Sequence, residues 1–544
     1  MAGTSIRDPL ADPATTVAPS AEPPQARSWH GPHVTSERLR GALVVGAPAL
    51  LALALCLYEL GTRSLWLDES ATVAIASQHG GAFGAALARD GGNMLGYYAL
   101  LHVLIGAFGD GAFVIRLPAA LAAGATAAIV SWLAIRLFDR RVALAAGVLT
   151  AVSLPLVFWG QDARGYTAMI ALLAGSFLAL DMMLRGDGGW RAWIAYTALI
   201  TAAVYMGLEA ALVIPAQLLA LIWYRGRARA VISSVVVAGI LCIPLAVLAA
   251  GRGSSQLFWV PPPSSRIAGQ VVQALTSSAL QPSFRTSTSA VLLVLTLVVL
   301  GFAARRIWRS LRSSDRAVRQ SGWAPVLIAA WLLVPAILAL LESLVGQSIF
   351  QARYLLVSLP AVALLLGWAL VAGGAFAAQR PAARFLALAT VLALVVLRAL
   401  QVAPSYGVSF ENWRSATSYV LVRTRPRDCA AFYPQDSRMP FKYYLGGRSS
   451  APRSVLPQAP WSEVRSYVED YSSLSRARVA GLPSSCSRVW LISSHEGKVG
   501  GPPASSADYK RYVLLQANLR MVYPRVNSRS FGYGGAVTIA LYSR

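Results

Sequence analysis

The sequence has little charge and few acidic residues. Only 13 % of its 544 residues are charged and 56 % are hydrophobic, whereas soluble domains carry roughly 25 % charged residues. Asp and Glu number 24 against 48 Lys and Arg, which gives a formal net charge of +24. A composition this apolar excludes an ordinary soluble domain and indicates a membrane protein.

The motifs of several soluble enzyme classes are also absent. The sequence contains no Walker loop, no GxGxxG unit between a strand and a helix, no HExxH and no CxxC pair. Soluble nucleotide cofactors are therefore not supported. The positive charge does not favour a nucleic-acid partner, because many basic residues form short clusters between apolar runs, as in the cytoplasmic loops of multispan proteins. We expect the lipid bilayer, and no nucleic acid, as a partner.

Apolar runs long enough to cross a bilayer recur as far as residue 402. A crossing needs about 20 apolar residues, and about eleven runs qualify. Four basic clusters (136–141, 225–229, 305–319 and 380–384) then fall on the same side as the N-terminus, which the positive-inside rule assigns to the cytoplasm. The predicted spans are 41–60, 112–137, 142–160, 167–184, 191–209, 210–224, 229–249, 288–304, 323–341, 354–376 and 384–402.

Residues 94–108 are apolar enough to be a further crossing. Counting them would reverse the side of every later basic cluster, so we interpret them as an interfacial or re-entrant helix on the outer face. The predicted fold is an α-helical polytopic membrane protein with about eleven transmembrane helices and this interfacial helix.

The two ends of the chain differ from this core. Residues 1–40 read as a disordered cytoplasmic tail, residues 41–402 as the transmembrane domain and residues 403–544 as a small extracytoplasmic α/β domain. Within the last part, Cys429 and Cys486 could pair if this part faces an oxidising compartment. Its predicted strands are 429–433, 488–493 and 536–543, and its predicted helices are 411–423 and 506–519.

Polar residues gather at the outer ends of the predicted spans. They are Asp68 with Glu69, residues 89–94, His102, residues 160–166, Glu209 and residues 351–354. Ionisable groups near a membrane are costly and usually functional, so this face is where we expect a site.

Each of these groups also has a plainer interpretation. Neighbouring residues on a helix face different ways, so Asp68 and Glu69 suit a general base with a supporting or metal-binding carboxylate, or else an ordinary charged loop. Asp162 and Arg164 could hold a cation and a phosphate, or join two helix ends. Arg353 beside Tyr354 is either a phosphate contact or a snorkelling anchor. His102 is either a ligand or acid or, more commonly, an interfacial or packed histidine, and Glu209 is either functional or a loop residue.

Four segments in order resemble a known family. They are "SLWLDES" after the first span, "NMLGYYALLH", "RLPAALAAG…FWGQDARGYTAM" and "QARYLLVSLPAVALLLG". Together they are similar to the membrane-embedded GT-C glycosyltransferases, of the type of protein O-mannosyltransferases and lipid A aminoarabinose transferases. The stretch "ENWRSATSYVLVRTRPRDCAAFYPQDSRMPFKYYL" resembles the extracytoplasmic domains of actinobacterial-type members.

The resemblance implies roles for particular residues. Asp68 matches the catalytic carboxylate of the family's first loop, and Glu69 is its neighbour. Asp162 stands where a second acid joins a divalent cation (Mg, Mn or Ca), although many relatives have Glu there, and Glu69 is the other candidate ligand. Many relatives also have Pro-Leu-Tyr-Tyr where this chain has Leu95-Gly96-Tyr97-Tyr98. The residues expected to bind substrate are Arg164, Arg353, Tyr354, His102, Tyr98 and Gln161.

The implied activity fits the predicted topology. Outside the cytoplasm a sugar donor must reside in the bilayer, which a polyprenyl-phosphate sugar does. We therefore expect an inverting transfer of a sugar, arabinofuranose or mannose, to an envelope glycan, glycolipid or protein at the plasma membrane during cell wall biogenesis. The alternative is a transporter or flippase of lipid-linked sugars, although transporters place ionisable residues near the bilayer midplane.

Overall fold

The computed structural model describes residues 32–253, 257, 260–280, 285–372, 379–446, 451–461, 470–495 and 506–544. The chain divides into two compact units, residues 1–42 and 43–544, and every site considered below lies in the second. Residues 1–31 of the predicted tail lie outside the described residues, and helix α1 (Pro32–Leu57) begins before the predicted tail ends.

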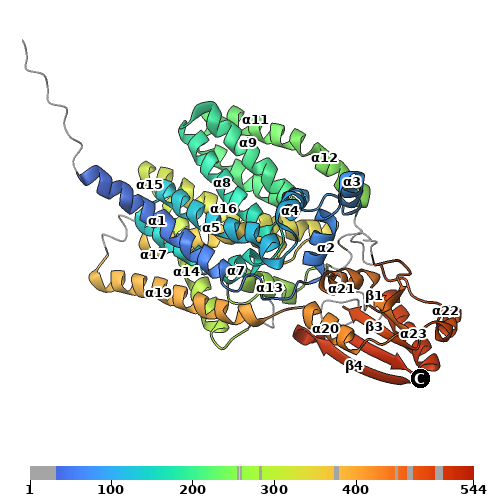
Figure 1. Cartoon of the computed structure of the whole chain (residues 1–544). Coiled ribbons are helices and arrows are strands. Elements are labelled where there is room, and N and C mark those ends of the chain that lie inside the picture. The colour runs from blue at the N-terminus through green and yellow to red at the C-terminus, as the bar shows by residue number, and fades with distance from the viewer. Residues whose placement is uncertain are drawn as a thin grey trace, which may run out of the picture. The chain divides into compact units, whose positions relative to one another are not determined.

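Seven helical segments of the described chain are long and apolar enough to cross a membrane, and the number rises to nine if two bent helix pairs are each one span. The multispan fold is confirmed, but the predicted number of about eleven spans is not. The seven segments lie in α1, α5 (Ala112–Leu137), α8 (Tyr166–Arg185), α14 (Ser289–Leu311), α15 (Arg316–Ser321) with α16 (Trp323–Val345), η6 (Tyr354–Ser358) with α17 (Leu359–Val371), and α19 (Pro381–Val402) with η7 (Ala403–Gly407) (Figure 1).

The bent pairs explain part of the difference. The predicted span 142–160 is α6 (Arg140–Ala151) and α7 (Leu154–Gly160), which meet at 54°. Pro155 stands at the start of α7, where it has no N–H for the Ala151 carbonyl and so ends the first helix. In the same way, Pro244 follows the break between α11 (Ala228–Leu241) and α12 (Ile243–Arg252), which meet at 49°.

Other predicted spans are short or irregular. The predicted span 210–224 is η1 (Leu208–Val213), α10 (Ile214–Leu218) and η2 (Leu219–Ile222), and the 18-residue α9 (Gly189–Met206) is not among the seven. Helix α4 (Leu95–Phe108) has 14 residues, about 21 Å at 1.5 Å per residue. The hydrocarbon core is about 30 Å thick, so this length suits the predicted interfacial or re-entrant helix.

The spans differ greatly in burial. In α8 and in the segment Tyr354–Val371, 83 % of the apolar window is buried within the protein, against 22 % in α14 and α19. Large apolar side chains such as Phe385 and Leu392 on α19 are more than 60 % exposed, as expected of side chains that face lipid. The two buried spans thus form the rigid centre of the helical part.

The C-terminal part contains a five-stranded sheet in the order β2-β1-β3-β5-β4. Strand β1 pairs in parallel with β2 and β3, and β5 pairs antiparallel with β3 and β4. The strands are β1 (Asp428–Tyr433), β2 (Arg453–Leu456), β3 (Arg488–Ser494), β4 (Arg525–Phe531) and β5 (Val537–Ser543). The three predicted strands are confirmed as β1, β3 and β5.

Helices cover both faces of this sheet (Figure 1). Because side chains alternate along a strand, Val489 and Leu491 of β3 pack with α23 (Ala507–Val522) and α22 (Arg476–Gly481), while Trp490 and Ile492 pack with α20 (Trp413–Arg423) and α21 (Arg438–Leu445). The predicted helices 411–423 and 506–519 correspond to α20 and α23. The predicted α/β class of this part is therefore confirmed.

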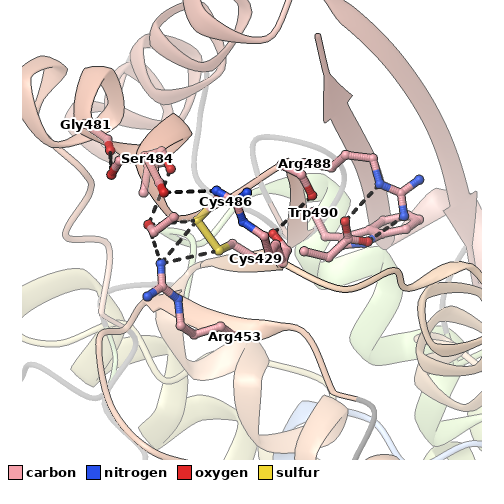
Figure 2. Close-up of a disulfide and its surroundings, with 12 residues drawn as sticks. Cys429, Arg453, Gly481, Ser484, Cys486, Arg488 and Trp490 are labelled. Atoms are coloured by element: carbon pink, nitrogen blue, oxygen red, sulfur yellow. Dashed lines mark hydrogen bonds and ion pairs between the residues drawn. A yellow bond between two sulfur atoms is a disulfide. The ribbon is translucent and has the colours of Figure 1, made fainter.

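A disulfide joins Cys429 of β1 to Cys486, which lies just before β3, and confirms the predicted pairing. Figure 2 shows Arg453 beside it, with the guanidinium directed at both sulfurs. Because β1 and β3 are neighbouring parallel strands, the bond fixes the two central strands at one end. The other cysteines, Cys56 and Cys242, are free thiols in the helical part.

Candidate active site

Two adjacent carboxylates in the first turn of α2 (Leu67–Ala76) point in different directions. Successive residues of a helix are about 100° apart, so Asp68 and Glu69 have separate surroundings, as predicted. Both are buried: Asp68 is 6 % exposed and Glu69 is 1 % exposed. Acidic side chains at this end of a helix also stabilise it through the helix dipole.

Glu69 is bound on its own side of α2. Arg116 of α5 donates from Nε to Oε1 and from Nη2 to Oε2, both at 2.7 Å, and the amide of Ala163 donates to Oε1 at 2.9 Å. Burial acts to raise the pKa of Glu69, but the charge and hydrogen bonds of Arg116 outweigh it and the pKa is lowered. Glu69 therefore joins α2 to α5 and to the 160–166 loop as an ionised carboxylate.

Asp68 faces two arginines. Nη1 of Arg353 donates to Oδ2 at 3.3 Å, and Nη2 of Arg164 lies 4.0 Å from the same oxygen. Arg353 directly precedes the segment Tyr354–Val371, and Arg164 precedes α8 by two residues. The arginines therefore stand at the beginnings of the two most buried spans, which hold them in place.

Arg164 is also held by neutral partners. Its Nη1 donates to Oγ1 of Thr72 at 3.2 Å and to the hydroxyl of Tyr98 at 3.3 Å. Gly165 follows it, and a Cβ there would lie 2.6 Å from the carbonyl oxygen of Met206. Only glycine allows the 160–166 loop to approach the end of α9 so closely, and this approach sets the position of Arg164.

Two more carboxylates lie near these arginines. Asp90, at the end of α3 (Gly80–Arg89), accepts from Arg252 at 3.1 Å and from the Tyr98 hydroxyl. Burial raises the pKa of Asp90 to about 7, against the opposing charges of Arg164 and Arg252. Glu209 of η1 lies within the fields of Arg164 and Arg353, and its Oε1 is buried without a hydrogen-bond partner in the described part of the chain.

Asp162 lies on the Glu69 side of α2. Both of its oxygens accept from Nε1 of Trp66 at 3.1 Å, and burial together with the charge of Glu69 raises its pKa well above the usual range. Beside it is a small pocket, also lined by Arg63 and Arg116. Burial lowers the pKa of Arg63 to about 10, with a further contribution from the charge of Arg116.

These carboxylates do not fit a divalent cation as they are arranged. Among the described residues no three His, Cys, Asp or Glu side chains are grouped so that they could hold a metal ion. Asp68 faces arginines, Glu69 is taken up by Arg116, and Asp162 favours its neutral form. The arrangement of the described residues therefore gives no support to the metal roles expected of Asp162 and Glu69.

The other residues expected to bind substrate lie in different places around α2. Gln161 donates to the carbonyls of Cys56 and Tyr58 and ties the 160–166 loop to the end of α1. Nδ1 of His102 contacts the carbonyl of Ala76, at the far end of α2 from Asp68, about 12 Å away along the helix. Tyr354 lies beside Arg353, whose guanidinium is 5.5 Å from the ring centroid.

Three polar residues of the site had no predicted role. Arg116 lies inside an apolar span, which is itself a signal of function, and Asp90 lies in a stretch noted only as polar. Glu411 had no signal in the sequence. Its carboxylate accepts from the backbone amide of Leu67, the first residue of α2, at 2.9 Å.

The loop before α2 is bound by the C-terminal part of the chain at several points. The Ser64 amide donates to Oγ of Ser409 at 3.2 Å, and the Leu65 amide donates to the Tyr444 hydroxyl at 2.7 Å. The guanidinium of Arg414 donates to the carbonyls of residues 61 and 62. Residues 409–444 therefore pack against the loop that precedes α2 and hold it in place.

Known proteins share this architecture. Residues 94–250 match the family model described as dolichyl-phosphate-mannose-protein mannosyltransferase, a stretch that contains Tyr98, Arg116, Asp162, Arg164 and Glu209. No curated protein sequence matches the chain.

Solved structures match it over almost its whole length. ArnT from Cupriavidus metallidurans in the apo state is 14 % identical with a TM-score of 0.52, and the match covers 94 % of this chain and 98 % of that one. ArnT from the same organism bound to undecaprenyl phosphate is 13 % identical with a TM-score of 0.52, and the match covers 91 % of this chain and 97 % of that one. The archaeal oligosaccharyltransferase AglB from Archaeoglobus fulgidus, in complex with an inhibitory peptide and a dolichol-phosphate, is 12 % identical with a TM-score of 0.51. This match covers 92 % of this chain and 74 % of that one.

At such low identity the solved structures establish the fold, and the family model adds the sequence relationship over the segment that carries the 160–166 loop. The chain therefore has the GT-C fold that the ArnT and AglB structures share.

Proposed function

We propose that the chain is an inverting glycosyltransferase that moves a sugar from a polyprenyl-phosphate donor to a hydroxyl acceptor. The observation that carries the proposal is the position of Asp68 against Arg164 and Arg353 at the start of the two most buried spans. A carboxylate base beside two fixed cations is what the transfer of a group from a phosphate leaving group needs. The undecaprenyl phosphate and dolichol-phosphate in the similar structures support this class of donor.

The proposed reaction is a single displacement. One carboxylate oxygen of Asp68 takes the proton of the acceptor hydroxyl while the hydroxyl oxygen forms a bond to the anomeric carbon. The bond from that carbon to the phosphate oxygen breaks, and its electron pair leaves with the polyprenyl phosphate. Arg164 and Arg353 then neutralise the charge on the phosphate as it departs. Attack opposite the leaving group inverts the anomeric configuration.

The ion pairs seen without a donor suggest how the site responds to substrate. The Asp68 carboxylate contacts Arg353. A donor phosphate offers the arginines a more highly charged partner, and their movement to it directs the Asp68 oxygen to the acceptor hydroxyl. Glu209 is the residue we assign to the sugar, because a carboxylate accepts hydrogen bonds from hydroxyls and its Oε1 is buried without a partner among the described residues.

The finer assignments rest on the resemblance of the C-terminal part. We propose arabinofuranose or mannose as the sugar and an envelope glycan, glycolipid or protein as the acceptor, on the extracytoplasmic side of the plasma membrane. The Cys429–Cys486 disulfide supports this side, because disulfides persist in oxidising compartments.

The test uses the purified full-length protein with a panel of polyprenyl-phosphate sugars and oligosaccharide acceptors. The expected result is release of polyprenyl phosphate with one donor, its loss in Asp68→Asn, and its retention in Asp110→Asn, which removes an exposed carboxylate. Release that survives Asp68→Asn would overturn the catalytic role. Movement of the donor across a vesicle membrane with no release would favour the transporter. In cells, an impermeant maleimide should label Lys510→Cys on α23 if this part is extracytoplasmic.

A further inference from the structure

Glu411 lies between the last span and α20, and its carboxylate is buried with 1 % exposure. Three donors surround it. Oε2 accepts from the Leu67 amide at 2.9 Å and from Nε1 of Trp413 at 2.5 Å, and Oε1 lies 3.2 Å from Nε2 of His495. One side chain thus connects α2, α20 and the end of β3.

The contact with Leu67 supplies what α2 lacks. The first amides of a helix have no partners within it, and a side chain at the N-cap normally accepts from one of them. Here the N-cap is Trp66, which makes no side-chain cap. Glu411 accepts from the first of these amides instead, across 344 residues of sequence. The negative charge also suits the positive end of the helix.

The capped residue directly precedes Asp68. A change in the position of this turn therefore moves the Asp68 carboxylate relative to Arg164 and Arg353. The burial of Glu411 raises its pKa, and the nearby charge of His495 opposes that effect. His495 has a φ of 53°, a conformation that residues other than glycine rarely adopt and that often marks functional sites.

We propose that Glu411 is a positioning residue of the transferase, which fixes the first turn of α2 and hence the Asp68 carboxylate, with His495 as a further contact of its carboxylate. The proposal rests on the proposed function for Asp68 as the base. It assigns the C-terminal part of the chain a second role besides any binding of an acceptor, because this part then completes the catalytic loop.

Asp428 provides a matched control in the same part of the chain. It too is a buried carboxylate with a cation and an indole as donors: Arg488 at 2.9 and 2.6 Å and Nε1 of Trp490 at 3.0 Å. Figure 2 shows Arg488 and Trp490 in the neighbourhood of the disulfide. Asp428→Asn therefore perturbs the sheet in a similar way without touching α2.

The experiment compares full-length Glu411→Ala, Glu411→Gln, His495→Gln and Asp428→Asn in detergent. Hydrogen–deuterium exchange of peptides covering residues 61–76 reports on the turn directly, and steady-state kinetics report on Asp68. We expect Glu411→Ala to speed exchange of the first α2 amides and to lower kcat about 100-fold, with the KM for the donor changed by less than about threefold because Arg164 and Arg353 remain. Glu411→Gln keeps one acceptor oxygen, so its kcat should be about tenfold higher than that of Glu411→Ala.

Two further results decide the role of His495 and the specificity of the effect. His495→Gln should reproduce the kcat loss in part, and Asp428→Asn should leave both exchange in 61–76 and kcat close to wild type. Unchanged exchange in Glu411→Ala, or an equal kcat loss in Asp428→Asn, would overturn the proposal. If the wild-type protein releases no polyprenyl phosphate from any donor, the proposed function fails, and the exchange data still decide whether Glu411 holds the turn.

Discussion

The guanidinium of Arg116 donates two hydrogen bonds of 2.7 Å to the two oxygens of Glu69, and both side chains are at most 2 % exposed. This pair lies one residue away from the proposed base, yet it faces a different side of α2, about 100° around the helix. The two carboxylates of one dipeptide therefore have separable roles, and variants of each should fail in different assays.

Removal of Glu69 should destabilise the protein. Glu69→Ala leaves the Arg116 charge buried without its partner, which costs about 3–5 kcal/mol, and the melting temperature in detergent should fall sharply. Asp68→Ala should lower it much less, because Arg353 is 19 % exposed and Arg164 keeps Thr72 and Tyr98 as partners. Glu69→Gln combined with Arg116→Met removes both charges and should restore part of the loss. A Glu69→Ala protein that melts with the wild type would contradict this assignment.

Arg353 should act mainly on donor binding. Arg353→Ala removes a charge-assisted contact worth about 1.5–3 kcal/mol, so the KM for the donor should rise about 10- to 100-fold. Arg353→Lys keeps the charge but not the planar guanidinium, so its KM should lie between those of the wild type and Arg353→Ala. Arg185→Ala, at the other end of α8 and bound to Asp181, is the control and should leave KM unchanged. An equal KM in all four proteins would remove Arg353 from the phosphate site.

Asp90 should make stability depend on pH. Burial raises its folded-state pKa to about 7, above the unfolded value of about 3.9, so the folded state holds the proton more tightly. The associated stability is complete below about pH 4 and is lost as the pH rises towards 7. Asp90→Asn mimics the protonated acid, so its melting temperature relative to the wild type should rise from pH 5 to 7.5. A difference that stays constant with pH would show that Asp90 remains ionised.

The disulfide should stabilise the sheet. It closes a loop of 57 residues, for which the chain-entropy model gives about 4 kcal/mol. Replacing Cys429 and Cys486 together by serine should therefore lower the unfolding temperature of the C-terminal part, as reported by near-UV signals of its tryptophans. Cys242→Ser, which removes a free thiol of the helical part, is the control. Equal unfolding of both proteins would indicate that the bond is dispensable.

A chelator should have little effect on turnover. The carboxylates near α2 are taken up by arginines and by amide and indole donors, so no set of them is arranged for a divalent cation among the described residues. Release of polyprenyl phosphate should therefore be the same with and without EDTA. A loss of activity that Mg, Mn or Ca restores would show that substrate binding rearranges Asp162 or Glu69 into a cation site.

The sequence predicted the class of the fold but not the number of spans. Apolar runs and basic clusters indicate crossings, yet Pro155 and Pro244 bend two of them, and the hydropathy of residues 208–222 does not show that 3₁₀ turns replace a regular helix there. In the C-terminal part, strands β1, β3 and β5 are apolar and were found. Strand β4 was missed because it lies at the sheet edge and its residues are almost all exposed.

The sequence predicted that candidate residues lie close together only where they are near in sequence, fall at the outer ends of predicted spans or match the family resemblance. Asp68, Arg164 and Arg353 do meet, because the spans that follow Arg164 and Arg353 pack at the centre of the helical part. Partners that come from afar could not be inferred. Arg116 lies 47 residues from Glu69, and nothing in the sequence connects Glu411 with Leu67.

That distance has a consequence for biogenesis. The ribosome makes the α2 segment some 344 residues before the carboxylate that caps it. During synthesis the first turn of α2 therefore lacks its cap until Glu411 has been made. If Asp68 is the proposed base, activity should arise only when the end of the chain has been delivered to the same side of the membrane. A protein truncated after its last span should insert into the bilayer and remain inactive.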